Sequence, residues 1–173
     1  MINMNKKIFI LIFVLSLSLA QICFAQDSLR YHWIASNDYE SLYFDKDTFS
    51  AKTIETVEGK YRLIDVWIKT TYSDVGAEDI SQYIKKQDKD AVINNGVKFS
   101  REHLLFKNNS REFVILYEDF YDKNDNCIFH QDYVNAQKWT SIAPESRAEV
   151  IHKAVNRYDI LQVLEKIRQD RKE

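Results

Sequence analysis

The sequence is poor in glycine, proline and cysteine, with 3, 1 and 2 of these residues among 173. Such a low glycine content leaves no G-x-G-x-x-G, P-loop or G-x-S-x-G pattern, which excludes the usual phosphate cradles and nucleophile turns. It also excludes flexible linkers and low-complexity segments. The chain is therefore expected to form regular structure over most of its length, without a nucleotide-binding or hydrolase signature.

Cysteine is too scarce for a disulfide framework. Cys23 lies in the amino-terminal leader, so Cys127 is the one cysteine expected in the mature chain, and no internal bridge can form. The apolar run 127–129 predicts a buried thiol. Cys127 and His130 are three residues apart, which on a strand predicts opposite faces and argues against a shared metal. We expect no metal and no cofactor site.

The first 25 residues have the three parts of a secretory signal peptide. Lys6 and Lys7 precede an apolar run over 8–20, and Cys23-Phe24-Ala25 offers a small-x-small cleavage pattern. That run is shorter than the roughly 20 residues needed to cross a bilayer. A lipid-modified Cys23 is the alternative, although bulky Ile22 precedes it. We predict a signal peptide over 1–25 and a single domain over 26–173, exported to the periplasm, the cell surface or the medium.

The mature chain is close to charge balance. The formal net charge is −2, and loss of the leader with its two lysines makes it −4. Nucleic acid binding by bulk electrostatics is therefore not expected. No later apolar run reaches spanning length, so no transmembrane segment is expected after cleavage. Basic residues at the C-terminus are expected to face a helix dipole: Lys166, Arg168, Arg171 and Lys172.

Alternation and turn signals predict seven strands, at 31–36, 41–45, 52–57, 61–72, 97–107, 111–122 and 127–134. A surface helix with a thin apolar stripe is expected over 73–94, closed by Asn95-Gly96. Short turns between successive strands favour antiparallel pairing. The predicted fold class is α+β, with a single antiparallel sheet of about six strands, a long C-terminal amphipathic helix and one mid-chain surface helix.

The C-terminal helix has a clear start signal. Ser146 and Glu149 form a capping box, and the helix is expected to run to about Gln169. Apolar residues at three- and four-residue steps predict a wide stripe facing the core: Ile151, Ala154, Val155, Tyr158, Leu161, Leu164 and Ile167.

Two groups of residues are candidates for chemistry. His130 and Asp132 are predicted to lie on the same face of a strand. Two interpretations remain open: the histidine acts as a general base beside the carboxylate, or both are ordinary polar residues on a solvent-facing strand. An acidic cluster near a hairpin lacks calcium-loop spacing, which leaves a solvated turn or weak cation binding: Glu118, Asp119, Asp122 and Asp125. The ten tyrosines suit either a recognition surface or ordinary strands. No catalytic residue is assigned, and the chain is not expected to be an enzyme.

A series of short motifs carries a family resemblance. In order they are Trp33-Ile34, Tyr43-Phe44-Asp45, Val66-Trp67-Ile68-Lys69, Tyr121-Asp122 and Trp139-x-x-Ile142-x-Pro144-x-Ser146. Over residues 31–158 this order resembles the surface-adhesin protein E family of small exported bacterial proteins. The resemblance implies a sheet packed with helices and displayed at the cell envelope. The named member looks like an adhesin for host matrix proteins. No ligand-binding residue is carried over.

The resemblance also implies roles for residues of this chain. Relatives commonly join a middle strand to the last helix by a cysteine pair, and the matching positions here have no cysteine: Asn108 or Asn109, and Val155 or Asn156. The helix extension Asp159–Ile167 is expected to compensate by added apolar burial. The matched residues are predicted to be structural, with the tryptophans as core or half-buried anchors, Asp45 bonding turn amides, and Pro144 and Ser146 fixing the helix entry: Trp33, Asp45, Trp67, Tyr121, Trp139, Pro144 and Ser146.

The leading functional hypothesis is an exported, non-catalytic envelope or surface protein that binds a host or envelope macromolecule through an aromatic sheet face or edge. The alternative is a periplasmic accessory module that binds a small ligand or a partner protein. A small hydrolase using His130 with Asp132 is the third reading. A homodimer through a sheet edge is left open. The identity of the ligand and a disulfide between the Cys127 residues of two chains are also left open.

Overall fold

A computed structural model describes residues 29–57 and 59–171, so the predicted signal peptide, 1–25, lies outside the described residues. The strands are β1 (Tyr31–Ser36), β2 (Glu40–Asp45), β3 (Ser50–Thr56), β4 (Gly59–Tyr72), β5 (Val97–Lys107), β6 (Glu112–Asp122), β7 (Cys127–Asp132) and β8 (Thr140–Ser141). The helices are α2 (Asp74–Gln87), α3 (Arg147–Asp170) and the 3₁₀ turn η1 (Val134–Ala136). The predicted α+β fold is confirmed, with eight strands in place of about six.

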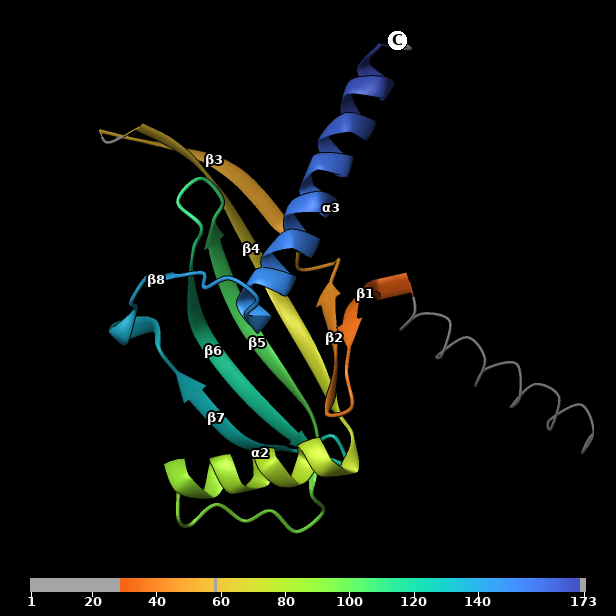
Figure 1. The fold of residues 1–173 in the computed structure, drawn as a ribbon, viewed down its shortest axis with the longest axis vertical. Coiled ribbons are helices and arrows are strands. Elements are labelled where there is room, and N and C mark those ends of the chain that lie inside the picture. The colour runs from red at the N-terminus through yellow and green to blue at the C-terminus, as the bar shows by residue number, and fades with distance from the viewer. Residues whose placement is uncertain (1–28, 58, 172–173) are drawn as a thin grey trace, which may run out of the picture. The chain divides into compact units, whose positions relative to one another are not determined.

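The strands form a single sheet in the order β1-β2-β4-β5-β6-β7 (Figure 1). The long strands β4 and β6 each pair with two short strands on their outer side. β4 takes β3 along its first half and β2 along its second, and β6 takes β8 at its start and β7 near its end. The pairings from β2 to β8 are antiparallel, as the short predicted turns require.

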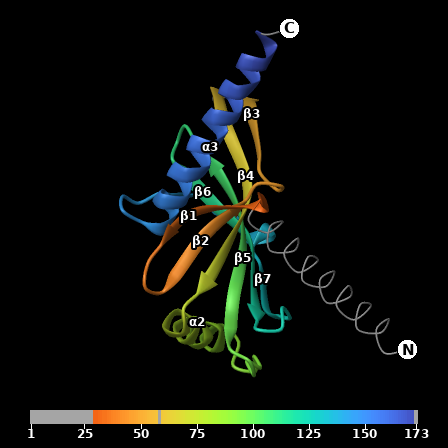
Figure 2. The ribbon, with the colours of Figure 1, turned by 90° about the vertical axis from the view of Figure 1, so that its right-hand side faces the viewer.

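Both described helices pack on one face of the sheet (Figures 1 and 2). Along β5 burial alternates residue by residue, because successive side chains point to opposite faces. The buried set, which includes Leu104 and Phe106, meets Ile151 and Val155 of α3 in the main core. A second core cluster joins α2 to the sheet through Ile84, Val97 and Phe120. The other set of side chains forms the face that neither helix covers.

Helix α3 begins where the capping box predicts. The Glu149 N–H donates to Ser146 Oγ at 3.2 Å. The Glu149 carboxylate accepts from the N–H of Glu145 at 2.9 Å, one residue before the expected partner. This backbone bond, with Lys153 and Arg111 nearby, lowers the pKa of Glu149 to about 2. The carboxylate therefore stays charged at the positive end of the helix dipole.

The predicted core-facing stripe of α3 is wrong beyond Tyr158. Leu161, Leu164 and Ile167 are 43–49% exposed, because α3 continues past the end of the strands (Figure 1). The expected apolar compensation by Asp159–Ile167 is therefore also wrong. A strong tie there is polar, since Arg62 donates to both carboxylate oxygens of Asp159 at 2.6 and 2.7 Å.

Helix α2 is shorter than predicted and ends at Gln87, not near Asn94. The Asp88 side chain accepts from the N–H of Asp90 at 3.0 Å, a local turn that competes with helix continuation. The start of α2 lies tightly against the β1–β2 hairpin. A Cβ added at Gly76 would lie 2.2 Å from the carbonyl oxygen of Tyr39, so this contact requires glycine.

Candidate functional site

Four nearly parallel rings form a group on the face of the sheet that neither helix covers, and we call this face of the sheet the ring face. The four rings are Trp67, His103, Tyr117 and His130. They come from β4, β5, β6 and β7 in turn. Successive ring centroids lie 4.8, 5.9 and 6.1 Å apart, with interplanar angles of 10°, 11° and 24°. The group therefore spans four neighbouring strands.

Trp67, His103 and Tyr117 come together through the register of the sheet. Trp67 is the cross-strand partner of His103, and His103 that of Tyr117. The Trp67 and Tyr117 centroids are themselves only 6.4 Å apart, with planes within 4°, so the three rings form a compact triangle and not a straight stack. Three of the four rings are half-buried, and His130 is exposed. Ring edges carry the positive part of the aromatic quadrupole and the N–H and O–H groups.

Acidic side chains hold both histidines of the ring face in place. His103 Nε2 lies 2.6 Å from Asp65 of β4, and His130 Nδ1 lies 2.5 Å from Asp119 of β6. The other ring nitrogen of His103, Nδ1, is the one buried side-chain nitrogen or oxygen without a partner in the described residues. The Arg101 guanidinium lies over the Trp67 ring, 5.0 Å from its centroid. Two carboxylates and one guanidinium therefore contact the rings.

A second aromatic pair extends the same face toward the β6–β7 turn. Phe99 and Tyr121 stack with centroids 4.6 Å apart and planes within 12°. The Lys69 and Lys98 ammonium groups lie 5.1 and 5.9 Å from the Phe99 centroid. Together with the four rings, this pair makes a half-buried aromatic surface bordered by cations.

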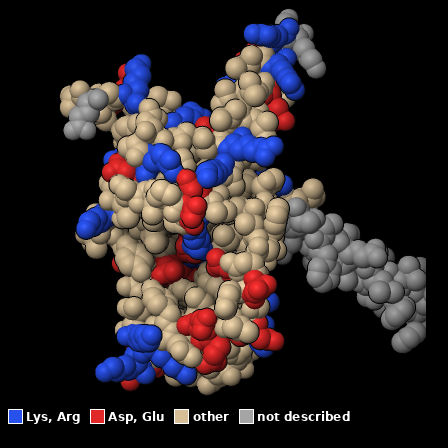
Figure 3. Space-filling view, viewed as in Figure 1, with Lys and Arg blue, Asp and Glu red and all other residues tan. Residues whose placement is uncertain are grey.

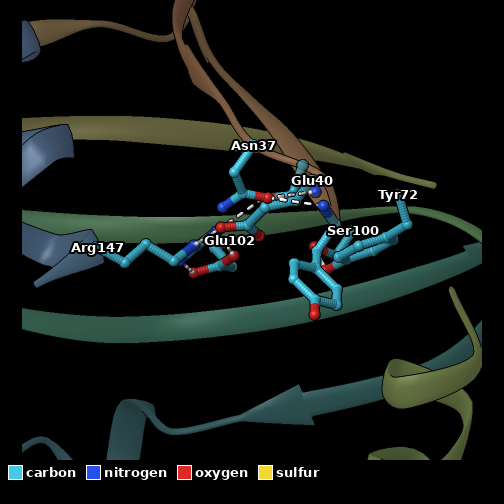
Figure 4. Close-up of polar contacts among 8 residues, drawn as sticks. Asn37, Glu40, Tyr72, Ser100, Glu102 and Arg147 are labelled. Carbon is cyan, nitrogen blue, oxygen red and sulfur yellow. Dashed lines mark hydrogen bonds and ion pairs between the residues drawn. The ribbon is translucent and has the colours of Figure 1, made fainter. Parts of the chain in front are cut away.

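The opposite, helix-covered face carries a buried polar cluster (Figure 4). Arg147, the first residue of α3, donates to both carboxylate oxygens of Glu102 at 2.6 and 2.9 Å and to the Thr70 hydroxyl at 2.7 Å. Glu40 lies 3.4 Å from the same guanidinium. Tyr72 and Ser100 share a hydrogen bond of 2.7 Å beside them. The arginine thus ties the start of α3 to β2, β4 and β5.

Glu118 lies next to this cluster and directly across the strand pair from Glu102. The hydroxyls of Tyr83 and Tyr133 donate to it at 3.5 and 3.3 Å. Desolvation by burial, followed by the negative charge of Glu102, raises the pKa of Glu118 to about 7. Burial and the nearby carboxylate also raise the pKa of Tyr133. Of these groups, Glu118 is therefore the one poised to change charge near neutrality.

A recess opens between α2 and the start of α3, and acidic and basic atoms are visible inside it (Figure 3). At the base of α3 a pocket of about 220 Å³ is lined by residues that include Asn37, Glu40, Leu42 and Arg147. Since Arg147 is already satisfied by Glu102 and Thr70, its main effect there is structural.

The two groups of residues that were candidates for chemistry do not assemble into a site. His130 bonds Asp119, whereas Asp132 accepts from the N–H of Val134 at 2.7 Å. The acidic cluster is divided between the two faces, with Glu118 on the helix-covered side and Asp119 on the ring face. Asp122 is occupied by the turn amides of residues 124 and 126. Among the described residues no three metal-ligating side chains converge.

The prediction for Cys127 is wrong on two counts. The thiol is exposed, and a bulge at Ile128 shifts the register. Cys127 therefore lies opposite Tyr121 and His130 opposite Asp119, which puts both on the ring face and not on opposite faces.

The family-matched residues have mixed outcomes. Asp45 is buried and accepts from the Asp47 N–H at 3.1 Å, as predicted. Trp33 is 58% exposed, so it is no core anchor. Trp67 and Trp139 are half-buried, and Lys107 lies 4.1 Å over the Trp139 ring. The remaining three lie at element ends or on the ring face: Tyr121 stacks on Phe99, Ser146 caps α3 and exposed Pro144 precedes that cap.

Sequence reasoning missed the ring face and the Arg147–Glu102 bond. Trp67, His103 and Tyr117 belong to different strands, and their alignment depends on a register and a bulge that no local pattern encodes. The available signal was weak: aromatic residues at outward positions of strands that were otherwise predicted correctly.

No helix in the described residues is long and apolar enough to span a membrane. Comparison of the chain with protein families, curated proteins and solved structures finds no match.

Proposed function

We propose that this protein is an exported, non-catalytic envelope or surface protein that binds a macromolecular partner through the ring face. The observation that carries the proposal is the group of rings from Trp67 to His130 on a face that neither helix covers. Aromatic side chains bordered by arginine are the usual energetic centres of recognition surfaces. The leader-like residues 1–25 support export.

The chemistry of the ring face favours a polypeptide partner. Stacking of sugars or bases needs open ring faces, and here neighbouring rings and the Arg101 guanidinium over Trp67 cover part of them. The N–H and O–H groups of such rings suit carbonyl and carboxylate acceptors, which a protein supplies along its backbone and acidic side chains. Arg101 and Lys69 at the border steer acidic groups toward the rings.

One contact supports the resemblance to the surface-adhesin protein E family. The side chains of Asn108 and Asn156 meet, with Nδ2 of Asn108 donating to Oδ1 of Asn156 at 2.6 Å. Asn108 and Asn156 are among the positions where the resemblance implies a cysteine pair between a middle strand and the last helix. The pocket at the base of α3 favours a second function, an accessory module that binds a small ligand there.

The binding test uses the mature chain and two double variants. The ring variant carries Trp67→Thr and Tyr117→Thr, which keep strand-forming residues but remove the rings. The control carries Leu161→Thr and Leu164→Thr on the exposed part of α3. Binding to a panel of immobilised host matrix proteins is measured by surface plasmon resonance. We expect wild type and control to bind and the ring variant to weaken by at least about tenfold. Equal binding by the ring variant refutes the ring-face site.

The location is tested separately by fractionation of the source cells with protease added outside. Mature protein cut at residue 25 and found in the envelope or medium is the expected result. Uncut precursor in the cytosol overturns export. A strictly periplasmic protein eliminates adhesion and leaves the accessory-module alternative.

A further inference from the structure

Strand β7 forms an open edge of the sheet. It pairs with β6 on one side, and in the part of the chain that the structure describes no strand pairs with its other side (Figure 1). Such an edge is a template for another strand, and proteins usually protect it with lysine, proline or a bulge. Strand β7 has no Lys, Arg or Pro, and its bulge at Ile128 leaves residues 129–132 regular.

Strand β3 offers an instructive contrast within the same sheet. It too has a single neighbour, β4, over its whole length. It carries Lys52 and Glu55, charges of the kind that blunt an edge. Of these two edges, that of β7 is therefore the better suited to accept a strand.

The main-chain groups available on β7 follow from its pairing with β6. The Tyr133 N–H donates inward to Leu116 O at 2.9 Å. Since hydrogen-bonding direction alternates along an antiparallel strand, Gln131 and Phe129 also bond inward. The N–H and C=O groups of His130 and Asp132 consequently point away from β6.

We propose that β7 pairs antiparallel with β7 of a second copy of this chain, about a twofold axis at Gln131. This register sets His130 opposite the partner's Asp132, and Asp132 opposite the partner's His130. An axis at His130 would instead set that residue against its own copy. His130 bonds Asp119 through Nδ1, which leaves Nε2 to reach the partner's Asp132. A hydrogen bond from a histidine to a carboxylate directly across a strand pair stabilises the pair, so the β7 edge is self-complementary.

The pairing has consequences for strength and for the ring face. Four main-chain hydrogen bonds and a short edge bury less than the roughly 800 Å² per partner of a stable complex, so association is expected to be weak. A twofold axis perpendicular to the sheet keeps both ring faces on the same side. The dimer would thus present two ring faces side by side, which strengthens binding to an extended partner by avidity.

The register is tested by cysteine cross-linking in a Cys127→Ser background. Gln131→Cys places two thiols at a non-hydrogen-bonded pair with Cα atoms about 4.5 Å apart, within the range of roughly 4.4–6.8 Å that a disulfide spans. Thr53→Cys on the β3 edge is the matched control. In a glutathione redox buffer we expect covalent dimer from Gln131→Cys at least about tenfold faster than from Thr53→Cys. Equal rates overturn the proposal.

Sedimentation velocity of the Cys127→Ser chain tests the noncovalent dimer. We expect a concentration-dependent dimer below about 1 mM, the scale of a weak contact. His130→Pro removes an outward N–H and is expected to abolish that dimer. Should His130→Pro fail to fold by circular dichroism, Asp132→Lys sets a lysine against the partner's His130 and is expected to have the same effect. A chain that is monomeric at about 1 mM, or an undiminished dimer in Asp132→Lys, overturns the proposal. Neither result depends on whether the ring face binds a partner.

Discussion

Replacing the Asn108–Asn156 contact by a disulfide is expected to stabilise the domain. The two side chains already touch at 2.6 Å, and the bridge would close a loop of 48 residues. Loop-closure entropy for that length corresponds to about 4 kcal/mol at 25 °C. For a domain of this size this corresponds to a rise in Tm of about 10 °C. The variant is Asn108→Cys with Asn156→Cys in a Cys127→Ser background, which leaves one possible pairing.

The substitution also removes native interactions, so the comparison must isolate the bridge. Asn108 lies 2.9 Å from Nε2 of buried His152, and losing this partner costs about 1–3 kcal/mol. Urea unfolding of the same double variant, oxidised and reduced, cancels that cost because both forms lack the asparagines. We expect the oxidised form to be more stable by about 3–4 kcal/mol. Failure to oxidise, or equal stability of the two forms, would refute the inferred correspondence with the family's cysteine pair.

Three further substitutions test the helix-covered face. Arg147→Met leaves Glu102 buried without its partner and is expected to destabilise the domain by about 3 kcal/mol in urea unfolding. Adding Glu102→Leu to this variant should recover much of the lost stability. A cost below about 1 kcal/mol for Arg147→Met alone would contradict the structural role of the arginine. Gly76→Ala drives a methyl group into the Tyr39 carbonyl and is expected to lower stability by about 1–3 kcal/mol, whereas an unchanged Tm would show that α2 can shift without cost. The pKa of Glu118 is raised to about 7, so protonated Glu118 contributes to the free energy of unfolding of the domain. This contribution is fully present at a pH below the ordinary glutamate pKa near 4.5, and it is lost as the pH rises through 7. Glu118→Gln should therefore match wild type at pH 4 and exceed it by about 1 kcal/mol at pH 8 after allowance for partial exposure; a constant difference across this range would contradict the burial of the charge.

Local signals in the sequence were sufficient for most elements of the fold. Alternation located the seven longer strands to within a few residues, and Ser146 marked the start of α3 through a cap that needs no tertiary information. The two-residue strand β8 escaped prediction because pairing with β6, and not propensity, defines it.

The wrong predictions of burial share a physical cause. Local sequence patterns show which side of a helix or strand is apolar, but they do not show whether another part of the fold covers that side. Leu161 and Leu164 continue the apolar stripe of α3, yet the sheet ends before it reaches them. Cys127 sits in an apolar run, but the bulge at Ile128 turns it outward.

The candidate sites depend still more on tertiary register. Arg147 and Glu102 are 45 residues apart in sequence, and nothing local indicates that they meet. The ring face likewise required the alignment of four strands. The aromatic composition predicted a recognition surface in general terms, and the fold was needed to say which residues make it.

Site-specific photocrosslinking in the source cells tests the central claim most directly, because it reports location and contact together. p-Benzoylphenylalanine is introduced at position 117 within the ring face and, as the control, at position 161 on the exposed part of α3. After irradiation in the presence of host matrix proteins, we expect position 117 to yield a discrete adduct with a protein in the envelope or outside the cell, and position 161 to yield none. Adducts confined to the cytosol, or equal adducts from both positions, would contradict the account.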